Sequence, residues 1–247
     1  MSVNFSLVLP CYNEEKNIDL ICKEFLSLQL KDYSAELILV NNGSRDDTKN
    51  EIQNAIKSNS NSNVKIKLVD LKNNIGYGGG ISEGLKVATG DYIGWAHADL
   101  QTPLKDFLKL FEEIKGKKNI LGKGFRTNNR GFDGIISRFH ETLASLILGF
   151  KMREINAQPK IFNKELMSFF NKMPHKWTIL DTYIVYTCLV NKIEIKTIDV
   201  LFNTRKYGDS KWKNNFKNFI THIFVNIIYL FELRFSKQDY KNINKNI

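Results

Sequence analysis

Residues that could hold a metal ion next to a phosphate lie close together near the middle of the chain. His97 and Asp99 are two positions apart in the segment GDYIGWAHADLQTP, so an extended backbone would direct both side chains to the same side. A carboxylate there can bind Mg²⁺ or Mn²⁺ and leave further coordination sites for water and phosphate oxygens. The alternative is that Asp99 only caps a helix expected to begin near Pro103.

Two other polar clusters follow apolar runs that are typical of buried strands. Residues 12–14 come directly after the run 5–10, and residues 41–44 come after the run 36–40. Ligands bind at the carboxyl ends of the strands in parallel α/β sheets, so we expect both clusters to lie beside the candidate metal ligands in one crevice. The alternative for residues 41–44 is a simple turn, because Asn, Gly and Ser all favour turns.

The apolar pattern predicts an α/β fold with a mostly parallel sheet flanked by helices. Strand-like or extended runs are expected at 5–10, 36–40, 64–71, 91–98, 155–162 and 193–203. Helical periodicity is expected at 14–29, 131–150, 181–191 and 212–235, with a further helix that ends near residue 90. Strands that alternate with helices imply right-handed crossovers between parallel neighbours.

A cluster of glycines precedes the helix that ends near residue 90. It consists of Gly76, Gly78, Gly79 and Gly80. The spacing is not that of a phosphate-binding P-loop, because no Gly-Lys-Ser/Thr follows. We interpret the cluster as a tight entry into a helix that lies near this crevice.

Six segments in order resemble family 2 glycosyltransferases of the GT-A fold. They are LVLPCYNEE, LILVNNGSRDDT, NNIGYGGG, GDYIGWAHADLQTP, INAQPKIF and RKYGDSKW. The chain is most similar to the group of dolichol-phosphate-mannose synthase and bacterial polyprenyl-phosphate glycosyltransferases, over about residues 5–212. The resemblance implies a GT-A domain at 1–211, with a nucleotide-sugar half at 1–102 and an acceptor half at 103–211. A C-terminal amphipathic helix at 212–236 and a tail at 237–247 would follow.

The resemblance implies roles for residues around the donor nucleotide. Asp99 matches the last Asp of the family's DxD motif and would bind the metal ion, with His97 where the family usually has Asp. Pro10, Tyr12 and Glu14 would surround the nucleotide. Asn41 and Asn42 stand where the family often has two aspartates, so the side chain that reads the base is an amide. An amide both donates and accepts, which leaves uracil and cytosine open as partners.

The resemblance also implies roles on the acceptor side. Asp181 matches the position of a catalytic carboxylate and would be the general base for a hydroxyl acceptor. A phosphate acceptor is already mostly ionised at neutral pH, so a base would then matter less. The alternative is that Asp181 is a helix N-cap. Gln158 resembles a position that lines the acceptor, and its alternative is a polar residue on an extended edge beside Pro159.

Basic residues near the end of the match resemble groups that face phosphates. Arg205, Ser210 and Lys211 resemble the family's RxxGxSK motif, which orders over the donor diphosphate, and we expect Arg205 and Lys211 to assist the transfer. Arg126 and Arg130 resemble other phosphate-facing arginines. Planar guanidinium groups suit a diphosphate because they donate two parallel hydrogen bonds. Each arginine could instead be a solvated surface residue.

Composition and apolar helices bear on location and partners. The formal net charge of +10 favours anionic partners, while nothing but charge points to nucleic acid, which we do not expect as a partner. An odd number of cysteines and no signal-peptide pattern at the start predict a cytoplasmic protein. The helices at 131–150 and 212–235 are expected to lie on the inner face of a membrane, to form an oligomer, or to pack on the sheet.

The leading hypothesis is an inverting glycosyltransferase that uses Mg²⁺ or Mn²⁺. Its donor would be a nucleoside diphosphate sugar, and its acceptor a polyprenyl phosphate or a lipid-linked surface glycan. A sugar hydroxyl acceptor in lipopolysaccharide or capsule assembly is the nearest alternative. A non-catalytic nucleotide-binding protein on the same fold is a second, because Asn41 and His97 replace expected acidic residues. A nucleotidyltransferase is disfavoured, because no Gly-rich loop with Arg or Lys follows the first strand.

Overall fold

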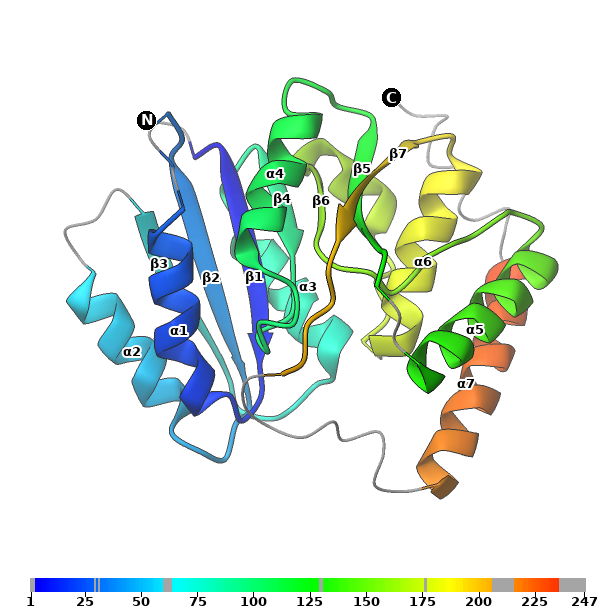
Figure 1. Cartoon of the computed structure of the whole chain (residues 1–247), viewed down its shortest axis with the longest axis horizontal. Coiled ribbons are helices and arrows are strands. Elements are labelled where there is room, and N and C mark those ends of the chain that lie inside the picture. Colours follow the sequence, from blue (N-terminus) through cyan, green and yellow to red (C-terminus); the bar gives the residue numbers. More distant parts are fainter. Residues whose placement is uncertain are drawn as a thin grey trace.

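The strands of the chain form one mixed sheet. The computed structural model describes residues 3–28, 30, 32–59, 64–128, 131–175, 177–205 and 216–235. In these residues the sheet has the order β3-β2-β1-β4-β6-β5-β7 (Figure 1). The strands are β1 (Phe5–Cys11), β2 (Ala35–Asn42), β3 (Val64–Leu71), β4 (Tyr92–Trp95), β5 (Ile120–Arg126), β6 (Lys160–Asn163) and β7 (Glu194–Val200). Only β6 runs antiparallel to its described neighbours, so the expected mostly parallel α/β sheet is confirmed.

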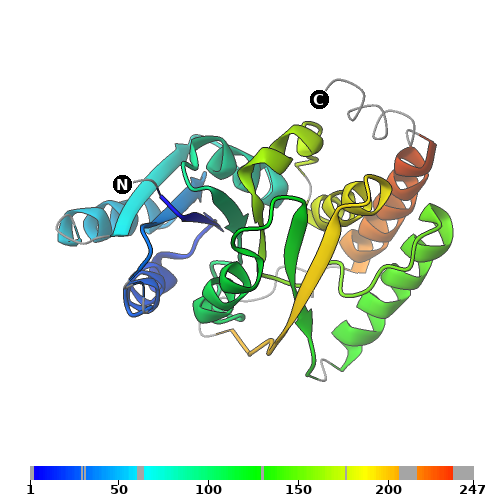
Figure 2. The same cartoon turned by 90° about the horizontal axis from the view of Figure 1, so that it is seen from above.

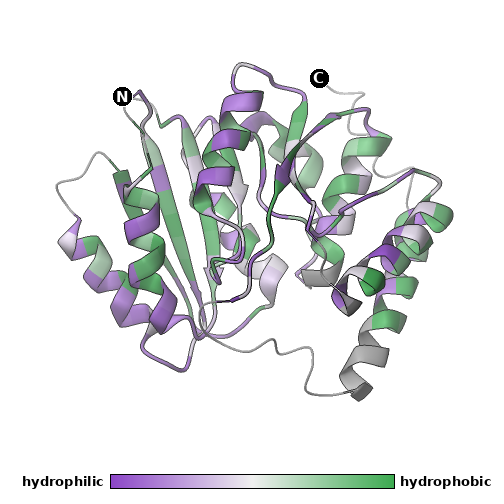
Figure 3. Cartoon of the chain, viewed as in Figure 1, coloured by the Kyte–Doolittle hydropathy of each residue, from purple (hydrophilic) through white to green (hydrophobic). Residues whose placement is uncertain are grey.

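Helices cover both faces of this sheet (Figure 2). They are α1 (Glu15–Leu26), α2 (Thr48–Ser58), α3 (Tyr77–Val87), α4 (Leu104–Ile114), α5 (Phe132–Leu148), the 3-10 helix η1 (Lys164–Phe170), α6 (Trp177–Val190) and α7 (Phe216–Phe235). One apolar core joins the sheet to α1, α2 and α4, and the other joins it to α3, α5, α6, α7 and η1. Figure 3 shows the apolar strands between these two layers.

Burial on both faces explains why the first strands read as continuous apolar runs. All residues of β2 are buried, and in β1 only Pro10 is partly exposed. Parallel strands covered by helices on both sides have no solvent face and therefore no alternation. Strand β5 was not predicted, because Gly122, Lys123 and Gly124 interrupt its apolar pattern.

Strand direction determines which loops meet. The parallel strands β1, β2, β4, β5 and β7 all end at the same edge of the sheet. Strand β6 begins at that edge because it is reversed, with Lys160 opposite Trp95 at the end of β4. The segment before β6 therefore meets the loops that follow the parallel strands. We call this edge the carboxyl edge.

The two long apolar helices pack on each other and also expose apolar side chains. Helix α7 contacts α5 and α6, with Leu230 and Leu233 buried, so it is part of the second core. The exposed large side chains are Ile135, Phe139 and Leu146 on α5, and Phe224, Ile228, Phe231 and Phe235 on α7. Among the described residues, no helix combines the length and apolar character needed to cross a membrane.

A buried carboxylate, that of Glu36, joins several segments at the edge of the sheet opposite the carboxyl edge. Glu36 of β2 is 1% exposed, accepts a hydrogen bond from the Ser6 hydroxyl at 2.7 Å and pairs with Lys67 at 2.6 Å. It also accepts from Thr89. Burial alone would raise the pKa of Glu36, but hydrogen bonds from Lys67, Thr89 and Ser6 outweigh it and lower the pKa to about 2.

We predict that Glu36→Gln destabilises the protein in a pH-dependent way. A carboxyl whose pKa falls from 4.5 to about 2 on folding stabilises the folded state by roughly 3 kcal/mol at neutral pH. That stability is present above pH 4.5 and is lost as the pH falls towards 2. Urea unfolding at several pH values should show the variant's deficit shrinking in acid. Glu165→Gln, which breaks an exposed pair with Lys118, is the control and should cost little.

Candidate functional site

The loops that follow β1 and β2 are joined by hydrogen bonds at the carboxyl edge. The backbone N–H of Asn13 donates to the Ser44 hydroxyl at 3.1 Å, and the N–H of Arg45 donates to Asn13 Oδ1 at 2.8 Å. Glu14, at the N-cap of α1, accepts from the Asn17 amide at 2.6 Å. Tyr12 lies half-buried between β1 and this junction. The two predicted polar clusters, residues 12–14 and 41–44, are therefore joined by hydrogen bonds into one wall, which is the predicted nucleotide wall.

The amide of Asn41 is tied to a carboxylate that the sequence analysis missed. Its Nδ2 donates to Asp70 Oδ1 at 2.7 Å, and its Oδ1 accepts from the N–H of Ser44 at 3.2 Å. The ion pair with Lys49 and the bond from Asn41 lower the pKa of Asp70. Asn41 thus stabilises the turn and also holds Asp70 at the end of β3. An acidic residue near the end of the strand-like segment VKIKLVDL was the available signal.

The side chain of Asn42 is hydrogen-bonded to the glycine-rich segment at the start of α3. Its Nδ2 donates to the carbonyl of Gly76 at 2.9 Å, and its Oδ1 accepts from the N–H of Ile75 at 3.1 Å. Gly76 is the N-cap of α3 with φ +84°, and a Cβ on Gly78 would lie 2.2 Å from the carbonyl oxygen of Pro174. Only glycine fits such an approach, so the expected tight helix entry is confirmed.

The other glycines of the entry lie against the wall formed by β1 and β2. A Cβ on Gly80 would lie 3.3 Å from Pro10 Cβ and 3.2 Å from Asn42 Nδ2. Helix α3 can therefore approach the ends of both strands closely. Pro10 consequently contributes a packing surface for α3 at the carboxyl edge.

His97 and Asp99 lie in the segment that follows β4, which ends at Trp95 rather than at residue 98 as predicted, and Arg205 meets them there. Asp99 is 6% exposed, and its Oδ2 lies 3.2 Å from Arg205 Nη2. Its Oδ1 accepts from the N–H of Gln101 at 3.1 Å. Gln101 Oε1 in turn accepts from Arg205 Nε at 3.1 Å. The structure therefore brings together two segments that are more than a hundred residues apart.

The helix-cap alternative for Asp99 is wrong. Helix α4 begins at Leu104, and its first N–H donates to Glu24 Oε1 of α1 at 2.7 Å. Asp99 instead accepts a hydrogen bond from the backbone N–H of Gln101, a residue that lies three positions before the helix begins. Its carboxylate is therefore held by the loop rather than by a helix terminus.

His97 lies in an environment that keeps its ring neutral. Its ring stacks on Tyr77, with centroids 5.3 Å apart and an angle of 29° between the planes. Burial lowers the pKa of His97, and this outweighs the raising effect of the Asp99 and Asp181 carboxylates. A neutral imidazole offers a nitrogen lone pair to a metal ion or a hydrogen bond to a ribose.

Asp181 and Gln158 lie together, as the acceptor assignment requires. Gln158 Nε2 lies 3.2 Å from Asp181 Oδ1 and 3.3 Å from Oδ2, and both residues are 2% exposed. Helix α6 begins at Trp177, so Asp181 lies inside the helix and the N-cap alternative is wrong. The edge alternative for Gln158 is also wrong, because β6 lies between β4 and β5.

Lys160 is the site residue that the sequence analysis missed most clearly. It is 0% exposed, and its Nζ lies 2.6 Å from Asp181 Oδ1 and 2.9 Å from the carbonyl oxygen of Ala157. A lysine inside the apolar segment QPKIF was the signal, because a buried ammonium group requires a nearby anion.

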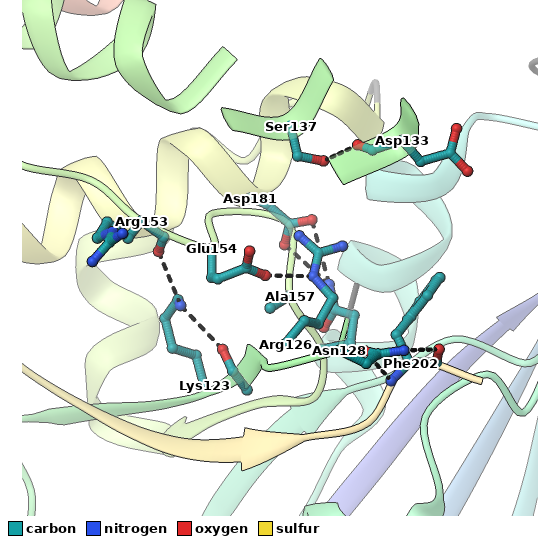
Figure 4. A network of polar contacts seen from close by, with 12 residues as sticks. Lys123, Arg126, Asn128, Asp133, Ser137, Arg153, Glu154, Ala157, Asp181 and Phe202 are labelled. Carbon is teal, nitrogen blue, oxygen red and sulfur yellow. Dashed lines mark hydrogen bonds and ion pairs between the residues drawn. The ribbon is translucent and has the colours of Figure 1, made fainter. Parts of the chain in front are cut away.

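Arg126 lies in a second buried charge cluster beside the first (Figure 4). Its Nε pairs with Glu154 Oε2 at 2.5 Å, and its guanidinium lies 5.7 Å from the centre of the Phe202 ring. The surface alternative for Arg126 is wrong, because its side chain is 6% exposed. Its Nη2 is buried and has no hydrogen-bond partner among the described residues. Burial, reinforced by Lys160, lowers the pKa of the neighbouring Lys123 to about 7.

Other buried polar atoms at the carboxyl edge also lack partners. They include the hydroxyl of Tyr77 and Oε1 of Gln158. Most buried polar atoms in proteins are hydrogen-bonded, so these atoms can take partners from a bound ligand. A separate hollow of about 690 Å³ lies at the opposite edge, beside Gly90, Gly116 and Lys164, and no predicted site residue lines it. Arg130, Ser210 and Lys211 lie outside the described residues.

Comparison with known proteins now identifies the family. A model described as "Glycosyl transferase family 2" matches residues 6–175, which include most of the described site. The chain belongs to this family. The match shows the family and assigns no role to any single residue, so the roles of the site residues stay predictions, and Asp181 and Arg205 also lie beyond the matched range.

Two curated relatives of this family 2 member carry a polyprenyl or dolichyl phosphate and a sugar in their names. Dodecaprenyl-phosphate galacturonate synthase of Rhizobium johnstonii is 25% identical over 217 residues, covering 85% of this chain and 62% of the relative. A dolichyl-phosphate beta-glucosyltransferase of Trichomonas vaginalis is 31% identical over 196 residues, covering 71% of this chain and 58% of the relative. The chain thus spans about six tenths of the length of these two relatives.

Solved structures confirm the GT-A fold. Glucosyl-3-phosphoglycerate synthase from Mycobacterium tuberculosis, in complex with Mn²⁺, uridine diphosphate and glucosyl-3-phosphoglycerate, superposes with a TM-score of 0.64. The two chains are 18% identical, and the superposition covers 94% of this chain and 80% of that one. At this identity the likeness concerns the fold alone.

We predict that Asn42→Ala loosens the entry to α3. The change removes two hydrogen bonds, which at about 1 kcal/mol each should lower the free energy of unfolding by roughly 2 kcal/mol. Asn50→Ala is the matched control, because Asn50 is exposed and bonds only its neighbour Asp47 in the same segment. Urea unfolding measures both variants. Unchanged stability with lost nucleotide binding would show that Asn42 contacts the nucleotide directly.

Proposed function

We propose that this family 2 protein transfers a sugar from a nucleoside diphosphate sugar to a polyprenyl phosphate, with inversion at the anomeric carbon. The observation that carries the proposal is the meeting of His97, Asp99, Arg205 and Asp181 at the carboxyl edge, where α/β folds bind ligands. The names of the curated relatives, which include a dodecaprenyl-phosphate galacturonate synthase and a dolichyl-phosphate beta-glucosyltransferase, support the acceptor class.

The residues after β4 fit a divalent cation. Asp99 supplies a carboxylate and neutral His97 supplies a ring nitrogen, and Mn²⁺ accepts both kinds of ligand. Among the described residues no cluster of three His, Cys, Asp or Glu side chains could enclose a metal ion, so a diphosphate and water would have to complete the coordination. When bound, Mg²⁺ or Mn²⁺ would neutralise charge on the diphosphate leaving group.

Arg205 would exchange its partner when the donor binds. In the structure its Nη2 pairs with Asp99 Oδ2 at 3.2 Å, which is an oxygen that a metal ion would also require. A diphosphate offers the guanidinium a replacement anion with matching bidentate geometry. Arg205 would then stabilise the charge that develops on the leaving group, with Ser210 and Lys211 from the same motif.

Residues at the ends of β2 and β3 offer both an amide and a carboxylate to the donor base. Asp70, held by Asn41, lies beside the turn that follows β2 and adds a carboxylate to the nucleotide wall. A carboxylate can accept from the N3–H of uracil, whereas an amide can also face cytosine. Pro10, Tyr12 and Glu14 would form the remaining sides of this pocket.

The acceptor side contains both a carboxylate and buried cations. Asp181 could take a proton from a sugar hydroxyl, which keeps the lipopolysaccharide or capsule alternative open. A phosphate acceptor needs no base, and the unpaired Nη2 of Arg126 is a donor suited to it. The exposed apolar side chains of α5 and α7 are suited to a membrane surface that carries a lipid acceptor, or to an oligomer contact.

We predict that Asp99→Ala abolishes metal-dependent sugar transfer. Wild type and variant should be assayed with UDP-, GDP-, dTDP- and CDP-sugars, Mn²⁺ and undecaprenyl phosphate, following sugar attached to lipid. One donor should turn over, and the variant should lose at least a hundredfold, because removing transition-state charge stabilisation has effects of that size. Asp19→Ala, on the exposed face of α1, is the control and should keep full activity.

The non-catalytic alternative makes the opposite prediction in the same assay. Nucleotide would then bind without sugar transfer to any acceptor, and Mn²⁺ would not change nucleotide affinity in calorimetry. Turnover that is equal in wild type and Asp99→Ala would instead reject Asp99 as the metal ligand.

We predict that Asp181→Asn separates the two acceptor classes. Transfer to a sugar hydroxyl should fall by on the order of a hundredfold or more, because the base is lost. Transfer to a lipid phosphate should only slow, because that nucleophile is already ionised. Initial rates with both acceptors at one donor concentration measure this. Equal loss with both acceptors would contradict a base role for Asp181.

A further inference from the structure

Lys160 connects three elements on the predicted acceptor side, namely β4, β6 and α6. It is the first residue of β6 and lies opposite Trp95 of β4, with its Nζ 5.9 Å from the centre of the Trp95 ring. The same Nζ reaches Asp181 Oδ1 on α6 at 2.6 Å and donates to the carbonyl oxygen of Ala157 at 2.9 Å. Its position is therefore set by the sheet, whereas Asp181 belongs to a helix.

The two oxygens of Asp181 are held unequally. Oδ1 receives the short contact from Lys160 and a longer one from Gln158 Nε2 at 3.2 Å. For Oδ2 the contact is the 3.3 Å approach of Gln158 Nε2. An ammonium–carboxylate bond is stronger than an amide–carboxylate bond, so the Lys160 contact dominates the orientation of the carboxylate.

Stability alone does not account for this buried pair. Desolvation of two charges costs about as much as their attraction returns, and apolar replacements of buried pairs are often neutral or stabilising. The pair also lies where the substrate groups are expected, because the charges of Lys160 and Asp181 both act on His97. A pair of this kind is suited to fixing the direction of a reacting carboxylate.

We infer that Lys160 is a positioning residue, which holds Oδ1 of Asp181 so that Oδ2 is directed to the acceptor. The inference rests on the proposed function in the form in which a sugar hydroxyl is the acceptor, because there Asp181 acts on the acceptor as the base. Lys160 itself contacts neither donor nor acceptor in this scheme. Its effect on catalysis therefore passes entirely through Asp181.

A double-mutant cycle in kcat tests this dependence, using the acceptor that gives the larger Asp181→Asn effect. Lys160→Met should lower kcat by on the order of ten- to a hundredfold, the range for outer partners that orient a reacting group, and leave the donor KM within about threefold. In the Asp181→Asn background the same change should alter kcat by less than about threefold. Lys160→Arg, which keeps the charge, should recover part of the loss.

Lys164→Met is the matched control, because Lys164 follows β6 at the opposite edge and donates to the carbonyl oxygen of Ala88. It should leave kcat unchanged. An equal loss from Lys160→Met with and without Asp181, or a loss confined to the donor KM, would overturn the inference. If Lys160→Met does not fold, Lys160→Arg and Lys160→Arg/Asp181→Asn complete the cycle.

Crystal structures of wild type, Lys160→Met and Lys160→Arg test the inference without any activity. In Lys160→Met the Asp181 carboxylate should leave its present position beside Gln158, and in Lys160→Arg it should keep it. An unmoved carboxylate in Lys160→Met would overturn the positioning role. If the wild type transfers no sugar, the proposed function fails, and the crystal structures still show whether Lys160 holds Asp181.

Discussion

The direction of one strand is the constraint on which the candidate site depends. Because β6 runs against β4 and β5, its first residue, Lys160, lies at the edge where the parallel strands end. The segment that contains Gln158 therefore enters the same crevice as the residues after β4. With β6 parallel to its neighbours, Gln158 and Lys160 would lie at the opposite edge, away from His97 and Asp99.

Three ion pairs of opposite charge lie at this edge. Asp99 pairs with Arg205, Asp181 with Lys160, and Glu154 with Arg126. In a medium of low dielectric constant each charge needs a close partner, so a charged ligand can enter only if partners are exchanged. Arg205 is the most exposed member of these pairs, at 33%, and is the one that a diphosphate would draw away. The Lys160–Asp181 pair is almost fully enclosed and is suited to staying in place.

The nucleotide wall and the acceptor side differ in how they are built. Asn41 and Asn42 use their amides to fix a turn and a helix entry, so the wall is rigid before any ligand binds. On the acceptor side, atoms such as Arg126 Nη2 and Gln158 Oε1 remain without partners. The helices that enclose this side, α5 and α7, bury one face in the core and expose apolar side chains on the other.

The sequence by itself determined the α/β class, most strands and helices, and the positions of Tyr12, Asn41 and Asp99 near the ends of strands, because local periodicity and turn residues encode these features. It missed β5, whose glycines and Lys123 mask the apolar pattern, and it placed Asp181 at a helix start rather than inside α6. Only the tertiary structure decided that β6 is reversed, that Arg205 reaches Asp99, and that Lys160 holds Asp181. Those relations join segments far apart in the chain, and they follow from strand pairing and from the need of each buried charge for a partner, neither of which a local pattern contains.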